Sequence, residues 1–213
     1  LAAPSIADDV RVLILSKFHP GDVSIEAERG GFSFDADGRT VLSRPGEPWR
    51  ATRYEDRLLF SSGEKRYVAD KIAVRPSRDG TVFALRAGTA RRRYRGMLSF
   101  RVVADEIEIV NRVDRDEYVD AVVFSEYEND AAAEALRALR VVVNTFAARG
   151  ARHSPRDGYD FCDLTHCQTY HGALTRTAVD LSTVRGMVLR RNGDLVEAVF
   201  HSTCGGLLFD ETY

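Results

Sequence analysis

Short segments of alternating apolar and polar residues fill the first half of this chain and restrict it to a mostly β fold. Residues 10–17 (VRVLILSK) form a continuous apolar run, which is typical of a buried strand. Further strand-like segments follow at 31–35, 40–42, 58–61, 72–76, 81–86, 97–103 and 106–110. Glycine-containing pairs separate them, among them Asp37-Gly38, Ser62-Gly63 and Asp79-Gly80. We therefore expect a succession of short strands without a fixed repeat.

One strong helix is expected after this β region. Asn129 or Asp130 can cap its first turn with a side-chain oxygen, and Gly150 fits its C-terminal stop. Apolar residues at helical spacing mark one face: Leu136, Leu139, Val143 and Phe146. A second, polar face carries Arg137, Arg140 and Asn144.

Strand-like sequence returns near the end of the chain. Residues 187–191 and 195–202 flank the pair Asn192-Gly193, which predicts a hairpin with a tight turn. Together the segments predict an α+β fold with a mostly β core and one main helix. The length of 213 residues suggests one domain, with room for an inserted lobe.

The charge balance excludes a broad class of function. Thirty basic residues oppose thirty-two acidic ones, so no net positive field attracts nucleic acid. No apolar run approaches the ~20 residues that span a bilayer. Residues 1–9 are expected to be an N-terminal tail, because Leu1-Ala2-Ala3-Pro4 fits either the end of a cleaved signal peptide or a trimmed chain.

A basic cluster interrupts the β region at Arg91-Arg92-Arg93-Tyr94-Arg95. Two interpretations stay open for it. It is either a solvated flank of a hairpin or a contact site for an anionic ligand.

Cysteine and histidine residues concentrate in one short region. Four possible metal ligands lie within fifteen residues: His153, Cys162, His166 and Cys167. Thiolates and imidazoles are the usual ligands of structural zinc, and four of them close a tetrahedral site. Alternatively, Cys162 and Cys167 form a short disulfide, or neither arrangement exists. Cys204 could replace His153 as a ligand or pair with one of the other cysteines.

Glu126 is the acidic residue that we single out. It follows an apolar stretch (Val119, Ala121–Phe124), expected to be a strand, and precedes the main helix. Apolar neighbours favour the protonated form of a carboxyl group, which can then act as a general acid. The competing interpretation is a solvated glutamate that favours the helix dipole.

Two further stretches are candidate parts of a binding site. Tyr170 and Gln168 combine a ring that can stack on a sugar face with an amide that can bind hydroxyl groups. His201 and Ser202 end a predicted strand just before Gly205-Gly206, where two glycines permit a close backbone approach. Core packing of Tyr170 and a plain turn at the glycines are the alternatives.

The order of several short motifs resembles the SpoIID/LytB family, that of stage II sporulation protein D and the amidase enhancers. The motifs, in chain order, are YRGML (94–98), VNRV (110–113), DEYV (116–119), VVFSE (122–126), EALRA (134–138), GYDFCD (158–163), THCQTY (165–170) and HSTCGG (201–206). The resemblance covers roughly residues 94–206, and the opening strand also fits. Within a SpoIID/LytB-like domain at 10–213, residues 20–90 would be a variable, β-rich inserted lobe.

The resemblance implies an extracytoplasmic protein of the bacterial cell envelope that acts on peptidoglycan. Sporulation members are lytic transglycosylases that cut peptide-free glycan strands, and their essential glutamate matches Glu126. Some members bind zinc at positions that resemble His153, Cys162, His166 and Cys167. Substrate-binding roles would fall on Tyr118, Arg140, Gln168, Tyr170, His201 and Ser202.

The chain departs from the family pattern in its helix. Leu139 stands where the family has glutamine, and Asn144 stands where it has arginine. Tyr127 and Glu128 replace the usual Met-Pro pair after the glutamate. Arg140 lies one turn before Asn144 on the same face, so it could supply the missing guanidinium.

These departures keep three functions open. The first is a lytic transglycosylase that uses Glu126 as general acid and then as base. The second is a glycan-binding module that recruits or stimulates an amidase without cutting anything, which Leu139 and Asn144 favour. The third is an inactive structural remnant.

Overall fold

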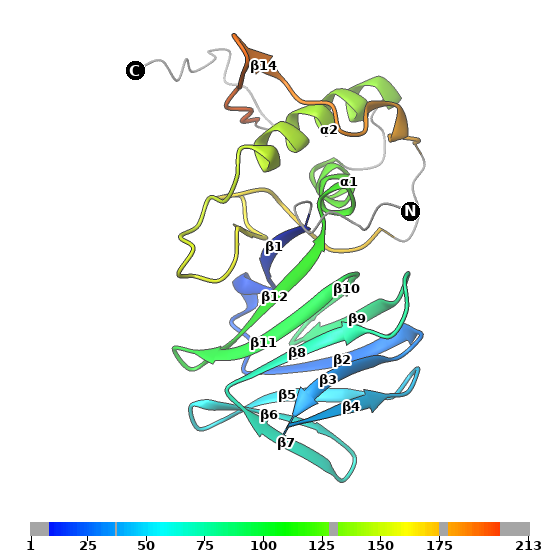
Figure 1. The fold of residues 1–213 in the computed structure, drawn as a ribbon, viewed down its shortest axis with the longest axis vertical. Helices are drawn as coiled ribbons and strands as arrows, with labels where there is room; N and C mark the ends of the chain where they lie inside the picture. Colours follow the sequence, from blue (N-terminus) through cyan, green and yellow to red (C-terminus); the bar gives the residue numbers. More distant parts are fainter. Residues whose placement is uncertain (1–8, 37, 128–131, 175–178, 201–213) are drawn as a thin grey trace.

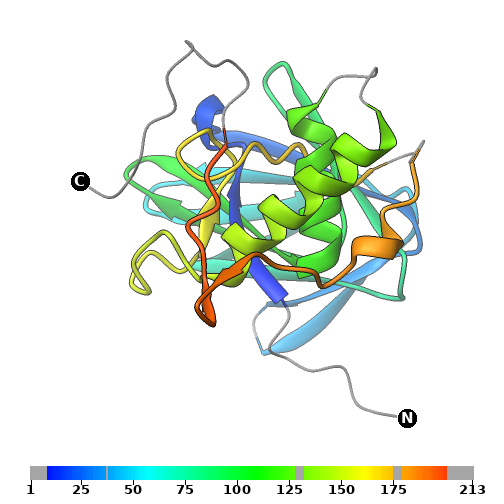
Figure 2. The same ribbon diagram turned by 90° about the horizontal axis from the view of Figure 1, so that it is seen from above.

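The computed structural model describes residues 9–36, 38–127, 132–174 and 179–200. Two stacked β-sheets form the body, and both α-helices lie over one end of it (Figure 1). Seen from above, the helices lie beside each other across the sheets (Figure 2). The predicted α+β class with a mostly β core is confirmed.

The first sheet has the strand order β13-β1-β12-β11-β8-β3-β4. Its strands are β1 (Asp9–Ile14), β3 (Phe32–Ala36), β4 (Arg39–Ser43), β8 (Lys71–Pro76), β11 (Met97–Val103), β12 (Glu106–Asp114) and β13 (Phe161–Cys162). The second sheet has the order β10-β9-β2-β5-β6-β7. Its strands are β2 (Asp22–Arg29), β5 (Trp49–Tyr54), β6 (Arg57–Ser62), β7 (Lys65–Ala69), β9 (Val82–Ala87) and β10 (Ala90–Tyr94).

Aromatic side chains fill the space between the two sheets. Trp49 and Phe60 of the second sheet stack with ring centroids 5.0 Å apart, and Phe34 of the first sheet meets Trp49 edge-on at 4.9 Å. The indole nitrogen of Trp49 donates a hydrogen bond to Ser43 Oγ at 3.0 Å, so its polar atom is satisfied inside the core. The alternating sequence pattern thus places one face of each strand in a shared core.

The segment at residues 20–90 is joined to the rest by strand pairing. Its strand β8 pairs antiparallel with β11, with Val74 opposite Leu98. Its strand β9 pairs with β10, with Phe83 opposite Tyr94. These residues therefore extend both sheets, and their inner faces belong to one core.

The helix α1 (Arg115–Glu126) follows β12 directly, and Asp114 caps it by accepting a hydrogen bond from the Glu117 backbone N–H at 3.1 Å. The prediction of a strand through residues 119–124 was wrong. The apolar run is a helix whose residues are buried on several sides, between the sheets and the second helix. A short, continuous apolar run cannot distinguish these two cases by periodicity.

The main helix is confirmed as α2 (Ala133–Ala148). Of its predicted apolar face, Leu136, Val143 and Phe146 are buried and Leu139 is half-buried, but Arg140 and Asn144 of the predicted polar face are buried as well. Gly150, with φ of 108°, follows its last turn as expected. The N-cap residue is Ala132, which makes no side-chain capping hydrogen bond. The cap was expected at Asn129 or Asp130, which lie outside the described ranges. No helix in the described ranges is long and apolar enough to cross a membrane.

The C-terminal hairpin is shorter than expected. The turn at Asn192-Gly193 is confirmed, because both residues have positive φ (53° and 92°), as a tight hairpin turn requires. The flanking strands β14 (Arg190–Arg191) and β15 (Asp194–Leu195) have only two residues each. Two short 3-10 helices, η2 (Ser16–Phe18) and η3 (Ser182–Val184), complete the described elements.

Gly96 lies where the chain turns from β10 into β11 and packs closely against the backbone of β12. It has φ of 77°, and a Cβ atom there would lie 2.1 Å from the Arg112 backbone oxygen. Gly96→Ala should therefore lower the free energy of unfolding by about 1 kcal/mol for the backbone conformation and about 1–3 kcal/mol more for the clash. Chemical denaturation measures this loss.

Gly80→Ala is the matched control. Gly80 also has positive φ, at 75°, but its Cβ would meet no atom within 4 Å. It should show only the conformational cost of about 1 kcal/mol. Equal losses for the two variants would contradict the close approach at Gly96.

Candidate functional site

The outer edge of β1 positions the segment that carries the cysteine and histidine residues. β13 pairs in parallel with this edge, with Leu13 opposite Cys162. On either side, the backbone N–H groups of Asp160 and Asp163 donate to the carbonyl oxygens of Arg11 and Leu13, at 2.8 and 3.0 Å. The segment at residues 150–174, yellow in Figure 1, is therefore attached to the sheet along a strand edge.

Two carboxylates strengthen this attachment. Asp160 accepts the Arg11 backbone N–H at 2.9 Å and forms an ion pair with the Arg11 guanidinium at 2.6 Å. Asp163 accepts the Leu15 backbone N–H at 2.7 Å and the Ser16 hydroxyl at 2.5 Å. Burial raises the pKa of Asp163. The two aspartates fix Cys162 between them.

The four predicted metal ligands come together in space. One donor atom from each of His153, Cys162, His166 and Cys167 lies within 4.8 Å of all the others. The two sulfur atoms are 3.5 Å apart, and His153 Nε2 lies 3.4 Å from Cys167 Sγ. His166 Nδ1 lies 3.8 Å from Cys162 Sγ and 3.5 Å from Cys167 Sγ.

These separations fit a tetrahedral zinc site better than a disulfide. Bonds of about 2.3 Å to sulfur and 2.0–2.1 Å to nitrogen place tetrahedral ligands about 3.3–3.8 Å apart. A disulfide would require about 2.05 Å between the sulfur atoms, and both cysteines are free thiols. The contact between the two thiols lowers the pKa of Cys162 and raises that of Cys167, so Cys162 is the thiol of the pair that loses its proton first. Cys204 lies outside the described residues.

Glu126 lies in a pocket next to this cluster. The pocket has a volume of about 350 Å³ and is lined by Glu126, Phe146, Thr165, His166, Cys167, Val199 and Phe200. The Glu126 side chain is half-buried, and its Oε1 accepts the Thr169 backbone N–H at 2.7 Å. Because Glu126 ends α1, the helix dipole does not stabilise negative charge there, contrary to the alternative considered from the sequence.

The segment at residues 168–173 passes between the end of α1 and β10. The His171 backbone N–H donates to Ser125 Oγ at 3.1 Å, beside the Thr169 bond to Glu126. Gly172, with φ of 93°, contacts the backbone oxygen of Arg93, where a Cβ atom would lie at 2.0 Å. Thr169 was not singled out from the sequence, since a backbone donor leaves no signal in the side-chain pattern.

Three residues predicted to bind substrate lie in the core behind the pocket. Tyr118 is fully buried and donates its hydroxyl to Gln168 Oε1 at 3.2 Å. Tyr170 is 2% exposed and donates to Asn111 Oδ1 at 2.8 Å. Burial raises the pKa of both tyrosines, so they remain neutral donors. The side chains of Tyr118, Gln168 and Tyr170 are thus buried, and the two tyrosine hydroxyls bond to protein groups, as in the alternative of core packing considered for Tyr170.

Comparison with known families agrees with this arrangement. Residues 103–194 match the family model of SpoIID, described as stage II sporulation protein. The chain carries a SpoIID-family domain. The match includes Glu126 and all four residues of the cysteine–histidine cluster. It associates the chain with cell-wall and sporulation-related proteins. Neither a curated protein nor a solved structure matches the chain.

In this SpoIID domain Arg140 has a different position from the one expected. Its side chain is fully buried, where it pairs with Asp116 at 2.6 Å and Asp120 at 2.7 Å. It also donates to the Val184 backbone oxygen at 3.2 Å. Arg185 adds a second guanidinium 3.5 Å from Asp116. Arg140 is thus engaged by protein groups and does not line the Glu126 pocket.

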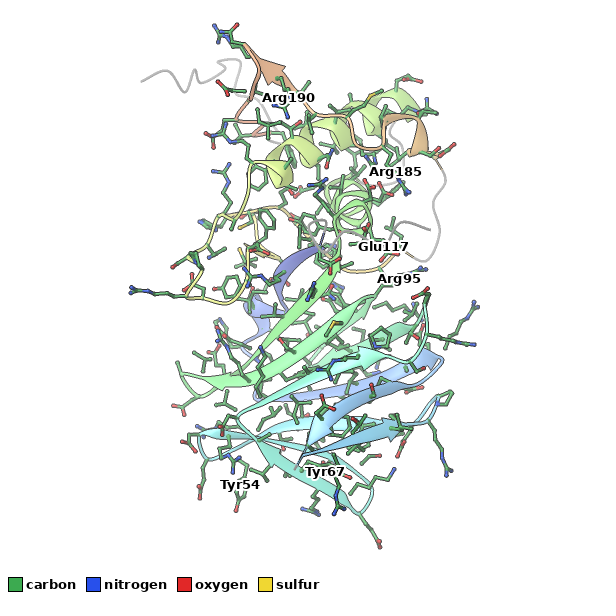
Figure 3. The ribbon with its side chains drawn as sticks, in the orientation of Figure 1. Tyr54, Tyr67, Arg95, Glu117, Arg185 and Arg190 are labelled. Atoms are coloured by element: carbon green, nitrogen blue, oxygen red, sulfur yellow. The ribbon has the colours of Figure 1, made fainter. Side chains whose placement is uncertain are left out.

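The polar face of α2 holds the segment that follows in the chain. Asn144 is 1% exposed and donates to the Met187 backbone oxygen at 2.8 Å. Arg137 donates to the Asp180 backbone oxygen at 3.3 Å. Figure 3 shows Arg185 beside α1, and Glu117 and Arg95 near the same helix on the side of the sheets. The predicted contacts of His201 and Ser202 lie outside the described residues.

Replacing Arg140 distinguishes a structural role from a substrate-binding one. Arg140→Ala should lower the free energy of unfolding by about 3–5 kcal/mol, because Asp116 and Asp120 would be left without their buried partner. Arg137→Ala, which removes a partly exposed arginine from the same face, should cost less than about 1 kcal/mol. Denaturation curves measure both. A stable Arg140→Ala protein with impaired glycan binding would restore the substrate-binding role.

Proposed function

We propose that this SpoIID domain is a peptidoglycan lytic transglycosylase that cleaves glycan strands, peptide-free strands above all, at the extracytoplasmic cell wall. The observation that carries the proposal is Glu126: a single half-buried carboxyl group in a pocket with aromatic walls. Phe200 is half-buried and offers a ring surface on which a sugar can pack, while Phe146 is buried and covered by the Arg152 guanidinium. The family motif that ends at Glu126 supports the same assignment.

One carboxyl group is enough for this reaction. Glu126 Oε1 is held by the Thr169 N–H, while Oε2 has no hydrogen-bond partner in the described part of the chain, so Oε2 is the atom that faces substrate. Protonated Glu126 gives its proton to the glycosidic oxygen as the bond to the anomeric carbon breaks and positive charge develops on the sugar. The carboxylate then removes the proton of the C6 hydroxyl, and O6 bonds to the anomeric carbon to close a 1,6-anhydro ring.

The pocket does not supply the second carboxylate of an ordinary glycosidase. Glu126 is the only acidic residue among the described residues that line it. Inverting and retaining hydrolases both need a pair of carboxyl groups, one of them to activate water or to act as the nucleophile. An intramolecular attack by O6 needs neither, which favours the transglycosylase reaction over hydrolysis.

Glu126→Gln should abolish cleavage of purified peptide-free glycan while the fold and glycan binding persist, because the amide cannot donate a proton as an acid. We expect at least about a 100-fold loss of anhydro-sugar products, measured by mass spectrometry. Glu117→Gln changes an acid of the same helix that lies near Arg95 and should cleave normally. Unchanged products from Glu126→Gln would remove Glu126 from the mechanism.

We further propose that the cysteine–histidine cluster binds one structural zinc ion. His153, Cys162, His166 and Cys167 supply four ligands, so the coordination shell is closed and the ion would hold the loop together. Through Cys167 and the adjoining residues, it would also hold the Thr169 N–H against Glu126.

Purified protein should contain one zinc ion per chain, and Cys162→Ser should lose it and unfold at a lower temperature, because structural zinc contributes directly to folding. Elemental analysis and thermal unfolding measure the two effects. His19→Ala, which removes an exposed histidine paired with Glu106, is the control and should keep its zinc. Retention of zinc by Cys162→Ser, or its absence from the unaltered protein, would contradict the assignment.

The second candidate function is a glycan-binding module that recruits or stimulates a cell-wall amidase. Asn144 favours it, because this residue stands at the family's arginine position and is buried against Met187. Glycan binding without soluble products, by protein with Glu126 intact, would support this module over the enzyme.

A further inference from the structure

A row of arginines crosses the outer face of the second sheet. Following the register from β10 to β7, directly opposed residues are Arg91, Arg86, Ser24, Arg50, Ser61 and Arg66. All four arginines are exposed, while the residues next to them in sequence, such as Leu85 and Ala51, are buried in the core. We call these six residues the arginine row. Asp22 lies beside it and neutralises Arg50, so Arg91, Arg86 and Arg66 are the row's arginines without an ion-pair partner within the described ranges.

The register of β9 and β10 places two of these charges directly against each other. Arg91 and Arg86 are cross-strand neighbours, an arrangement that destabilises a sheet because like charges repel. Neither has an ion-pair partner within the described ranges. Three acids of β2 lie on the same face: Asp22, Glu26 and Glu28. Asp22 pairs with Arg50 and Glu28 pairs with Arg93, whereas Glu26 lies opposite Ala84, two residues from Arg86 on β9. An anion between Arg86 and Arg91 would remove the repulsion.

The arginine row begins next to the catalytic pocket. The charged residues and histidine that line a cavity of about 390 Å³ here are Arg86, Arg91, Arg92, His171 and the ion pair of Arg93 with Glu28. The His171 backbone is bonded to Ser125, the neighbour of Glu126. Burial and then the charge of Arg92 lower the pKa of His171. The negative charge of Glu126 has the opposite, smaller effect and raises it. The two pockets share no lining residue and are related through the His171–Ser125 hydrogen bond, so a ligand of both would pass His171.

We propose that the arginine row binds the carboxylate groups of a glycan strand whose reducing or non-reducing part occupies the Glu126 pocket. The inference rests on the proposed function, because it takes the same strand as its ligand. Muramyl residues carry a free lactyl carboxylate only after their peptides are removed, so this surface would select peptide-free strands. Arg86, Arg50 and Arg66 are two strand spacings apart, about 9.6 Å, close to the length of one β-1,4-linked disaccharide.

The test measures, by calorimetry, the affinity of the full chain for soluble peptide-free glycan strands. The chain carries Glu126→Gln so that the strands are not cleaved during the measurement. Adding Arg86→Gln and Arg91→Gln should weaken binding by roughly tenfold, since two charge-assisted contacts are lost. Adding Arg39→Gln and Arg44→Gln instead removes two exposed arginines at β4, in the other sheet, and should leave the affinity within about twofold. Strands with methyl-esterified carboxylates should bind the unaltered row as weakly as native strands bind the double variant.

Several outcomes would overturn the inference. The first is that native and esterified strands bind with equal affinity. The second is that the two pairs of arginine substitutions lower the affinity equally. The third is that a glycerol-phosphate polymer binds more tightly than the glycan. A marked drop in unfolding temperature on replacing Arg86 and Arg91 would also overturn it, because relief of their repulsion should keep or raise that temperature. Cleavage by the unaltered chain without row-dependent binding would refute only the row, and row-dependent binding without cleavage would refute only the enzyme.

Discussion

The unpaired backbone edge of β1 is the constraint on which the site depends. A strand edge leaves N–H and C=O groups that need partners, and residues 160–163 supply them with backbone groups and two aspartates. This attachment sets the position of Cys162, which in turn brings the four cysteine and histidine donors together. From there the chain passes beneath α1 and presents the Thr169 N–H to Glu126. One edge therefore connects the sheet, the cluster and the acid.

Local patterns predicted much of the fold. Strands with apolar alternation, such as β11, and the amphipathic α2 were recognised because their buried face is visible in the sequence itself. The strands β2 and β10 were missed because charged residues dominate their outer faces; β10, for example, reads ARRRY. In α1 the opposite problem arose, since residues buried on several sides show no helical period.

The site was predictable in its chemistry and only partly in its geometry. Residue type and close spacing were sufficient to select the four metal ligands and, with the family motif, Glu126. Exposure is a tertiary property, however, and no sequence pattern showed that Tyr170 or Arg140 would be buried and bound by other protein groups. The basic cluster at residues 91–95 also separates into two faces, because alternate residues on β10 point to opposite sides of the sheet.

The pairing of β8 with β11 limits how this protein can be shortened. Residues 20–90 look like an insertion in the sequence, yet their removal would turn β11 into a bare edge and uncover Phe100, which packs on Phe60 of that segment. Such a truncation would expose both a strand template and an apolar surface, the combination that leads to aggregation. A minimal version of the domain must therefore retain at least β8 and a cover for its inner face.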